Sequence, residues 1–159
     1  MKAKLQEYAL IAEIIGAICI VISLIFVGIQ VKDNTTASEA ATYQASVGYD
    51  IELLMAVAGD PDMARIVSTY IYGDSSSLSE LDTTRAEYQM TALLRHLENL
   101  YSQHELGLLS DETWATRQAF VEAILLSPGY ERYQTSPLAR NFSGRFKAYA
   151  SQVRAEAAQ

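Results

Sequence analysis

The feature that most constrains this chain is an uncharged apolar segment near its N-terminus. Eighteen residues from Ile14 to Val31 contain no charged side chain, and only two glycines, a serine and a glutamine interrupt the aliphatic and aromatic residues. Counted from Leu10, the segment would be roughly 33 Å long as an α-helix, which is enough to cross a hydrocarbon core of about 30 Å. The sequence therefore predicts an N-terminal transmembrane anchor over residues 1–33.

The apolar segment is longer than that of a cleaved secretory signal, which covers about 7–15 residues. We therefore expect an uncleaved signal anchor that crosses the membrane once. Lys2, Lys4 and the terminal amine precede the segment, whereas Lys32 is the basic residue that follows it closely. The positive-inside rule then favours a cytoplasmic N-terminus. The remainder of the chain would lie on the outer side of an inner membrane, which is the periplasm if the cell has one.

The remainder, residues 34–159, has the size of one ordinary domain. The chain has a net charge of -7, which is distributed unevenly. Residues 33–131 hold sixteen acidic residues and four arginines, whereas residues 132–159 hold five basic residues and one glutamate. Because nucleic acid requires a positive footprint, we exclude it as a partner of this acidic body. The basic tail could contact anionic lipid, an acidic partner or the acidic body of its own fold, and we favour the last.

Apolar residues after the anchor recur at spacings of three and four, which predicts helices, and no alternating strand pattern is found. We therefore expect an all-α fold in which a transmembrane helix is followed by a small helical bundle. The polar run from Asp33 to Thr36 could break the helix but does not forbid it, so the next helix is either separate or a direct extension of the anchor. Caps, glycines and prolines place the expected helices at residues 34–58, 61–72, 80–105, 111–126, 129–135 and 138–156.

Small and polar residues form a stripe at a seven-residue period along the anchor. The stripe contains Ala9, Gly16, Ser23 and Gln30, with Glu13 at an alternate position. Membrane helices associate through small residues that let their backbones approach, so we interpret the stripe as a packing seam. The alternative is that scattered glycine and serine are common in spanning helices. Near the helix start, we expect Glu13 to snorkel to the interface, and a ring of these residues lining a pore is the alternative.

The sequence offers little that could support catalysis. His96 and His104, the only histidines, lie eight residues apart on one expected helix, hence about 12 Å apart along its axis, and cannot share a metal ion. Cys19, the single cysteine, lies within the membrane segment. We expect the histidines to be surface or capping residues. The sequence predicts no catalytic, cofactor-binding or metal site, and a hydrolase or metalloenzyme that uses a histidine is the minority alternative.

Arg95 and Glu98 are candidates for a structural ion pair, because they lie three positions apart on one expected helix. Leu94 and Leu97 lie close to both and could draw the pair to the edge of the core, where it would orient neighbouring helices. The alternative is an ordinary solvated pair within one helix.

Several segments resemble a widespread group of uncharacterised bacterial membrane proteins. The likeness begins in residues 11–17, 21–30 and 34–35 and continues in Asp60-Pro61-Asp62, Ala64-Arg65, Arg95, Glu98-Asn99, Gly107-Leu108-Leu109, Trp114 and Ser127-Pro128-Gly129. This resemblance spans most of the chain. It implies an N-terminal anchor in a bacterial inner membrane, a small helical domain and no assigned activity. Where such chains tend to carry an aromatic residue, this one has His96.

These features predict a non-enzymatic, membrane-anchored helical protein that forms a homo-oligomeric scaffold. Self-association would use the transmembrane seam and a second stripe from Ala37 to Ala58. The expected partners are membrane lipid and further copies of the chain, with no cofactor. The alternatives are an accessory subunit of a larger membrane complex and a small channel lined by Glu13, Ser23 and Gln30.

Overall fold

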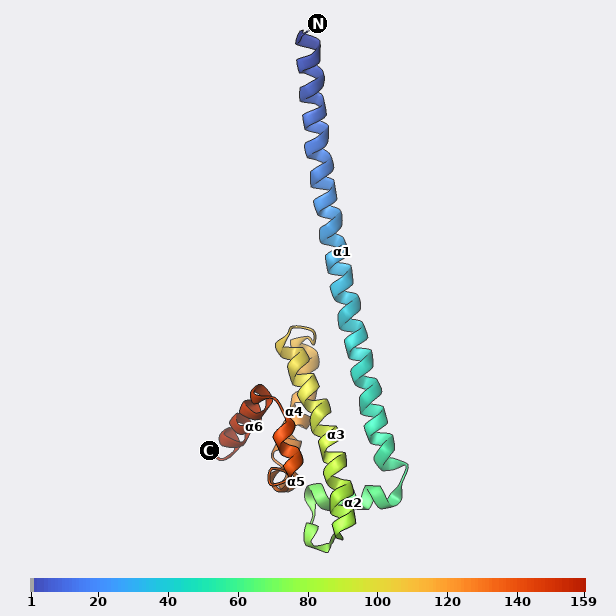
Figure 1. Ribbon diagram of the computed structural model, residues 1–159, viewed down its shortest axis with the longest axis vertical. Coiled ribbons are helices and arrows are strands. Elements are labelled where there is room, and N and C mark those ends of the chain that lie inside the picture. The colour runs from blue at the N-terminus through green and yellow to red at the C-terminus, as the bar shows by residue number, and fades with distance from the viewer. Residues whose placement is uncertain (1) are drawn as a thin grey trace. The chain divides into compact units, whose positions relative to one another are not determined.

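The computed structural model describes the backbone of residues 2–159 and their side chains, except those of residues 2, 3, 5, 7 and 9. The described residues are 87% helical and contain no strand. The expectation of an all-α fold, with a long apolar N-terminal helix followed by a small helical domain, is confirmed. The elements in chain order, labelled in Figure 1, are α1 (Lys2–Ala58), α2 (Pro61–Tyr72), η1 (Ser75–Ser77), α3 (Glu80–Glu105), α4 (Asp111–Leu125), α5 (Pro128–Tyr133), η2 (Pro137–Asn141) and α6 (Gly144–Ala157).

Helix α1 continues through the polar run after the apolar segment, so residues 34–58 are a direct extension of the apolar helix. The Thr35 hydroxyl donates a hydrogen bond to the carbonyl oxygen of Val31 at 3.0 Å. This bond is made within the helix, so Thr35 does not act as the cap of a new one. The helix ends at Ala58, and Asp60 then caps α2 by accepting hydrogen bonds from two backbone N–H groups.

The chain divides into two compact units between Ala41 and Thr42, whereas the sequence placed the domain boundary after residue 33. The first unit contains the apolar part of α1. Within the described residues, one helix is long and apolar enough to cross a membrane, and the apolar window within it is exposed throughout. The anchor segment predicted from the sequence therefore forms a helix of the required length and character.

The second unit, Thr42–Gln159, has one hydrophobic core in which α3 packs against α2, α4, α5 and α6. Polar caps define where these helices begin, because each cap accepts a hydrogen bond from a backbone N–H of the first turn. The capping residues are Asp60, Ser79, Ser110, Ser127 and Ser143. The core residues include Ile66, Tyr70, Ala86, Met90, Leu94, Leu97, Leu100, Trp114, Val121, Ile124, Leu125, Tyr133, Phe146, Ala150 and Val153.

The C-terminal segment differs from the single helix expected over residues 138–156. Pro137–Asn141 is a 3-10 helix, and α6 begins only at Gly144. The Ser143 hydroxyl accepts a hydrogen bond from the backbone N–H of Phe146 at 3.3 Å and so starts a new helix. The sequence does not mark this start, because Ser143 is followed by Gly144 and Arg145 and the first turn of α6 contains no acidic residue.

Helix α5 lies unusually close to the end of α2 at Gly129. A Cβ atom at this glycine would lie 2.6 Å from Cα of Ile71 and 2.9 Å from the carbonyl oxygen of Tyr70. Arg132, on the same short helix, donates to the carbonyl oxygen of Tyr70 and, at 2.7 Å, to that of Gly73. The missing side chain of Gly129 therefore allows an arginine to bind the free carbonyl groups at the end of α2.

Candidate functional site

The structure leaves the predicted packing seam of α1 open. Glu13, Gly16, Ser23 and Gln30 are all exposed, and nothing lies within 4 Å of a Cβ atom built at Gly16. The Ser23 hydroxyl donates to the carbonyl oxygen of Cys19 at 2.8 Å, so its proton is already used within the helix. The side chain of Ala9, the remaining seam residue, lies outside the described residues. The described seam thus presents small and polar groups with room for a close neighbour.

The Arg95 and Glu98 pair lies at the edge of the core. Arg95 Nη1 is 2.8 Å from Glu98 Oε2, and the Glu98 side chain is only 12% exposed. The other carboxylate oxygen of Glu98 accepts the backbone N–H of Ser143 at 2.6 Å. The Arg95 guanidinium lies 4.7 Å from the ring centroid of Phe142. The pair therefore connects α3 to the residues immediately before α6, and its contribution to stability remains a prediction.

The environment of Glu98 also affects its titration. Burial alone would raise its pKa, but the hydrogen bonds from Ser143 and the ion pair with Arg95 outweigh this effect. The pKa of Glu98 is consequently lower than that of an ordinary glutamate. Glu98 is therefore stabilised in its charged form, which is the form that holds Ser143 and Arg95.

The two histidines have different environments. His104 is partly exposed, its Nε2 lies 3.1 Å from Asp111, and its ring stacks on Trp114 with centroids 5.0 Å apart. His96 is buried, so the expectation that it is a surface or capping residue is wrong. The reason is that α1 covers it with Asp50 and the nearby ring of Tyr49. Among the described residues, no group of three potential metal-binding side chains is found.

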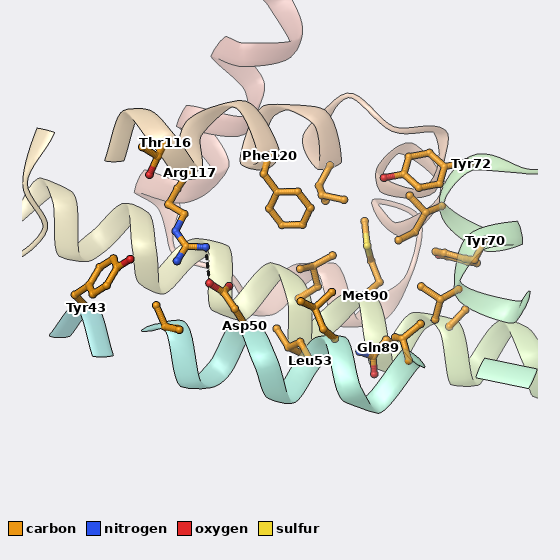
Figure 2. A pocket seen from close by; sticks show the side chains of 18 residues that line it. Tyr43, Asp50, Leu53, Tyr70, Tyr72, Gln89, Met90, Thr116, Arg117 and Phe120 are labelled. Atoms are coloured by element: carbon orange, nitrogen blue, oxygen red, sulfur yellow. Dashed lines mark ion pairs between the residues drawn. The ribbon is translucent and has the colours of Figure 1, made fainter. Parts of the chain in front are cut away.

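Asp50 is the residue that connects α1 to two helices of the bundle. One carboxylate oxygen lies 2.8 Å from Nε2 of His96 on α3. The other pairs with Arg117 on α4, and Figure 2 shows this ion pair. Sequence reasoning missed this cluster because its members are far apart in the chain. The available signal was the stripe Ser46, Asp50, Leu53 on α1, in which a charged residue occupies an inward-facing helical position.

Beside this cluster is a cavity of about 670 Å³ between α1, α2, α3 and α4 (Figure 2). Its walls are mainly apolar, and the Asp50 and Arg117 pair lies at one end together with Tyr43 and Thr116. Phe120, which is 50% exposed, also borders the cavity. Tyr70 and Tyr72 lie at the other end (Figure 2). Because the cavity combines a mainly apolar interior with a charged pair at one end, we treat it as the candidate binding site. The apolar wall residues are Val47, Leu53, Leu54, Val57, Val67, Ile71, Ala86, Met90, Leu93, Phe120 and Ile124.

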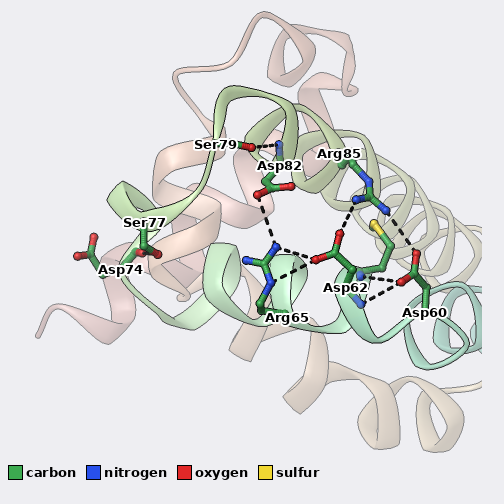
Figure 3. A network of polar contacts seen from close by, with 9 residues as sticks. Asp60, Asp62, Arg65, Asp74, Ser77, Ser79, Asp82 and Arg85 are labelled. Carbon is green, nitrogen blue, oxygen red and sulfur yellow. Dashed lines mark hydrogen bonds and ion pairs between the residues drawn. The ribbon is translucent and has the colours of Figure 1, made fainter.

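A second polar cluster joins the start of α2 to α3 and is shown in Figure 3. Arg85 lies 2.9 Å from Asp62, and Arg65 lies 2.7 Å from Asp62 and 3.5 Å from Asp82. Hydrogen bonds from Arg65 and then Arg85 lower the pKa of Asp62. Because arginines already neutralise these carboxylates, we interpret the cluster as a connection between two helices.

Comparison of the chain with protein-family models, with curated proteins and with solved structures found no match. The resemblance to bacterial membrane proteins described above therefore stays a prediction from the sequence.

Proposed function

We propose that this chain is a membrane-anchored, non-enzymatic helical protein that self-associates through α1 into a homo-oligomeric scaffold. The observation that carries the proposal is a heptad pattern along α1 whose described positions are exposed. The proposed location is a bacterial inner membrane, with a cytoplasmic N-terminus and an external or periplasmic helical domain. This orientation is supported by Lys2 and Lys4 before the apolar segment, against Lys32 after it.

The seven-residue period of the transmembrane seam continues to the end of α1 without a shift. A repeat of 3.5 residues is the pattern of helices that associate in a left-handed coiled coil, and small residues on such a seam permit close approach. All the residues at the two seam positions from Glu13 onward are exposed. They are Glu13, Ile20, Val27, Asn34, Ala41, Gly48 and Met55 at one position, and Gly16, Ser23, Gln30, Ala37, Gln44, Ile51 and Ala58 at the other.

Within the second unit, α1 has two faces of different character. Asp50 and Leu53 point toward the other helices and line the cavity. Ile51 and Met55 belong to the heptad pattern instead, and they are 56% and 62% exposed. Apolar side chains left at the surface in a regular row are typical of an interaction site, so this row supports association of α1 with another helix.

Cysteine cross-linking in membranes tests the proposal. In a Cys19→Ser background, Ala41→Cys places a thiol at a heptad position, and Glu39→Cys places one on the opposite face of the same helix. We expect oxidation to link Ala41→Cys chains into dimers and to leave Glu39→Cys chains largely unlinked. Equal linking of the two variants, or no linking of either, would contradict the proposed seam.

The small seam residues are tested by a matched pair of double variants. Replacing Gly16 and Ser23 by leucine should weaken self-association, because larger side chains keep the backbones apart. Replacing Ile18 and Ile22 by leucine changes the opposite face and should have little effect. The measurement is oligomer mass in detergent, and an unchanged mass in the Gly16 and Ser23 variant would count against the seam.

Native mass analysis of the purified wild type separates the proposal from its alternatives. A complex of one polypeptide supports a homo-oligomeric scaffold. Foreign chains in fixed stoichiometry would favour an accessory subunit of a larger complex. Conductance across bilayers that Glu13→Gln alters would favour a channel.

A further inference from the structure

We infer that the cavity between α1 and α4 binds a single long apolar chain with an acidic headgroup, such as a long-chain fatty acid, and that Arg117 contacts the headgroup. The inference uses residues of the second unit alone and does not depend on self-association. It assigns a ligand site to a part of the molecule that the proposed scaffold leaves unused.

The walls of the cavity favour an apolar occupant. The cavity opens to solvent, since Tyr43, Leu54 and Phe120 on its border are at least half exposed, and a bound ligand would remove their apolar surface from water. Each of the four surrounding helices contributes apolar side chains to the walls, for example Val57 on α1, Ile71 on α2, Leu93 on α3 and Ile124 on α4. A ligand that fills the space would therefore meet hydrocarbon on most of its surface.

The volume selects a single chain over a protein helix. At roughly 30 Å³ per non-hydrogen atom, a cavity of 670 Å³ holds about 20 such atoms, which matches a fatty acid of about 16 carbons. A three-turn helix of about 10 Å diameter would occupy roughly 1,250 Å³, about twice this volume. The volume therefore favours a single chain over a whole helix.

The position of the charged groups gives the ligand a direction, because Tyr70 and Tyr72 at the opposite end are uncharged. Figure 2 shows Arg117, Thr116 and Tyr43 together at one end, with Asp50 paired to the arginine. Asp50 is also hydrogen-bonded to His96, so its negative charge has a second partner. A guanidinium carries five N–H donors, and the described residues give Arg117 no acceptor other than Asp50. The remaining N–H donors of Arg117 can bind the carboxylate of the ligand at this end, while the hydrocarbon chain of the ligand extends past Phe120.

The experiment uses the full chain in phosphatidylcholine nanodiscs and a photoreactive analogue of palmitic acid. After illumination, we expect labelled peptides from residues 43–57, 86–93 and 116–124, and unlabelled palmitic acid should compete with the probe. Leu53→Trp fills the cavity and should reduce labelling of these peptides at least tenfold. Ala45→Trp adds the same side chain at an exposed position of α1 outside the cavity and should leave labelling within twofold of the wild type.

Two further variants keep the result decisive. Leu93→Trp obstructs the cavity from α3, so it serves if Leu53→Trp loses its helical circular dichroism. The double variant Asp50→Asn with Arg117→Gln removes both charges. It should reduce labelling by the acid probe severalfold, but it should not reduce labelling by a photoreactive alcohol of equal chain length.

Three results would overturn the proposed binding site, and a fourth would overturn the role of Arg117. Labelling confined to residues 10–31 would mean that the probe only partitions into the bilayer beside the anchor. Labelling that neither tryptophan variant reduces would place the probe outside the cavity. Absence of labelling in the wild type would mean that the cavity is closed or covered by another chain. If the double variant affects the acid and alcohol probes equally, the role of Arg117 is wrong.

Discussion

Asp50 shows how one carboxylate can hold three helices together. It belongs to α1, and its partners His96 and Arg117 belong to α3 and α4. The His96 side chain is 5% exposed, and those of Asp50 and Arg117 are 22% and 26% exposed. Polar groups this far from water depend on their partners, because losing one leaves the other unsatisfied. The position of α1 in the second unit therefore depends strongly on this residue.

Replacing Asp50 by alanine should lower the free energy of unfolding of the second unit by about 1–3 kcal/mol, since His96 and Arg117 both lose an acceptor. The exposed neighbour Glu52 gives a matched control, and Glu52→Ala should change stability by less than about 0.5 kcal/mol. Urea unfolding followed by circular dichroism measures both. Equal stabilities of the two variants would show that the Asp50 cluster contributes nothing.

Glu98 gives a prediction about pH. Its pKa in the folded protein is lowered, so its contribution to stability is complete above the pKa of the unfolded chain and is lost as pH falls through the folded pKa. The Glu98→Gln variant has no carboxylate at this position and therefore lacks this pH-dependent contribution to stability. We expect the stability difference between wild type and Glu98→Gln to shrink as pH falls from 6 toward 3. Thermal unfolding at several pH values measures it, and a constant difference would mean that the charge of Glu98 is unimportant.

At the scale of elements, the packing of α5 against α2 depends on Gly129. Gly129→Ala would place a methyl group against backbone atoms of Ile71 and Tyr70 that cannot move aside alone. We expect destabilisation of about 1–3 kcal/mol, as is typical of overpacking. Gly144→Ala is the control, because nothing lies within 4 Å of its Cβ position. If both variants unfold at the same temperature, the close approach at Gly129 has no energetic importance.

Elements whose boundaries depend on neighbouring residues could be predicted from the sequence, and contacts between distant residues could not. Asp60 and Ser110 cap helices whose starts follow from local spacing, and α2 covers the residues expected for it. Ser143 lacks a local signal of this kind, so the start of α6 was misplaced. The burial of His96 requires α1 to lie against α3, and no periodicity within either helix specifies that pairing.

At the scale of the whole molecule, the basic tail contacts main-chain oxygens as well as acidic groups. Arg154 lies 3.7 Å from Glu131 and also donates to the carbonyl oxygen of Leu125 at 3.1 Å. Arg132 and Lys147 donate to carbonyl oxygens, with Lys147 reaching that of Arg140 at 2.8 Å. Arg154 therefore contacts the acidic body of its own fold, as the sequence predicted. The basic residues of the tail also bind carbonyl oxygens at helix ends, which the sequence did not predict.

The division of the chain into two units leads to a prediction about truncation. Among the side chains that the structure describes, the hydrophobic core lies between Ile66 and Val153 and includes none from the first unit. Removing residues 1–41 should therefore leave residues 42–159 helical and cooperatively folded. A second fragment, residues 60–159, keeps the Asp60 cap but loses the last part of α1, and with it Asp50 and one wall of the cavity.

We expect the longer fragment to unfold at a urea concentration close to that of the full chain, because distant parts contribute independently. The shorter fragment should be less stable by at least about 1–3 kcal/mol, since His96 and Arg117 lose their acceptor and apolar wall residues become exposed. Circular dichroism of both fragments in urea measures this. Equal stability would mean that residues 42–59 only connect the apolar segment to the bundle. Unfolding of the longer fragment would show that the core depends on the first unit.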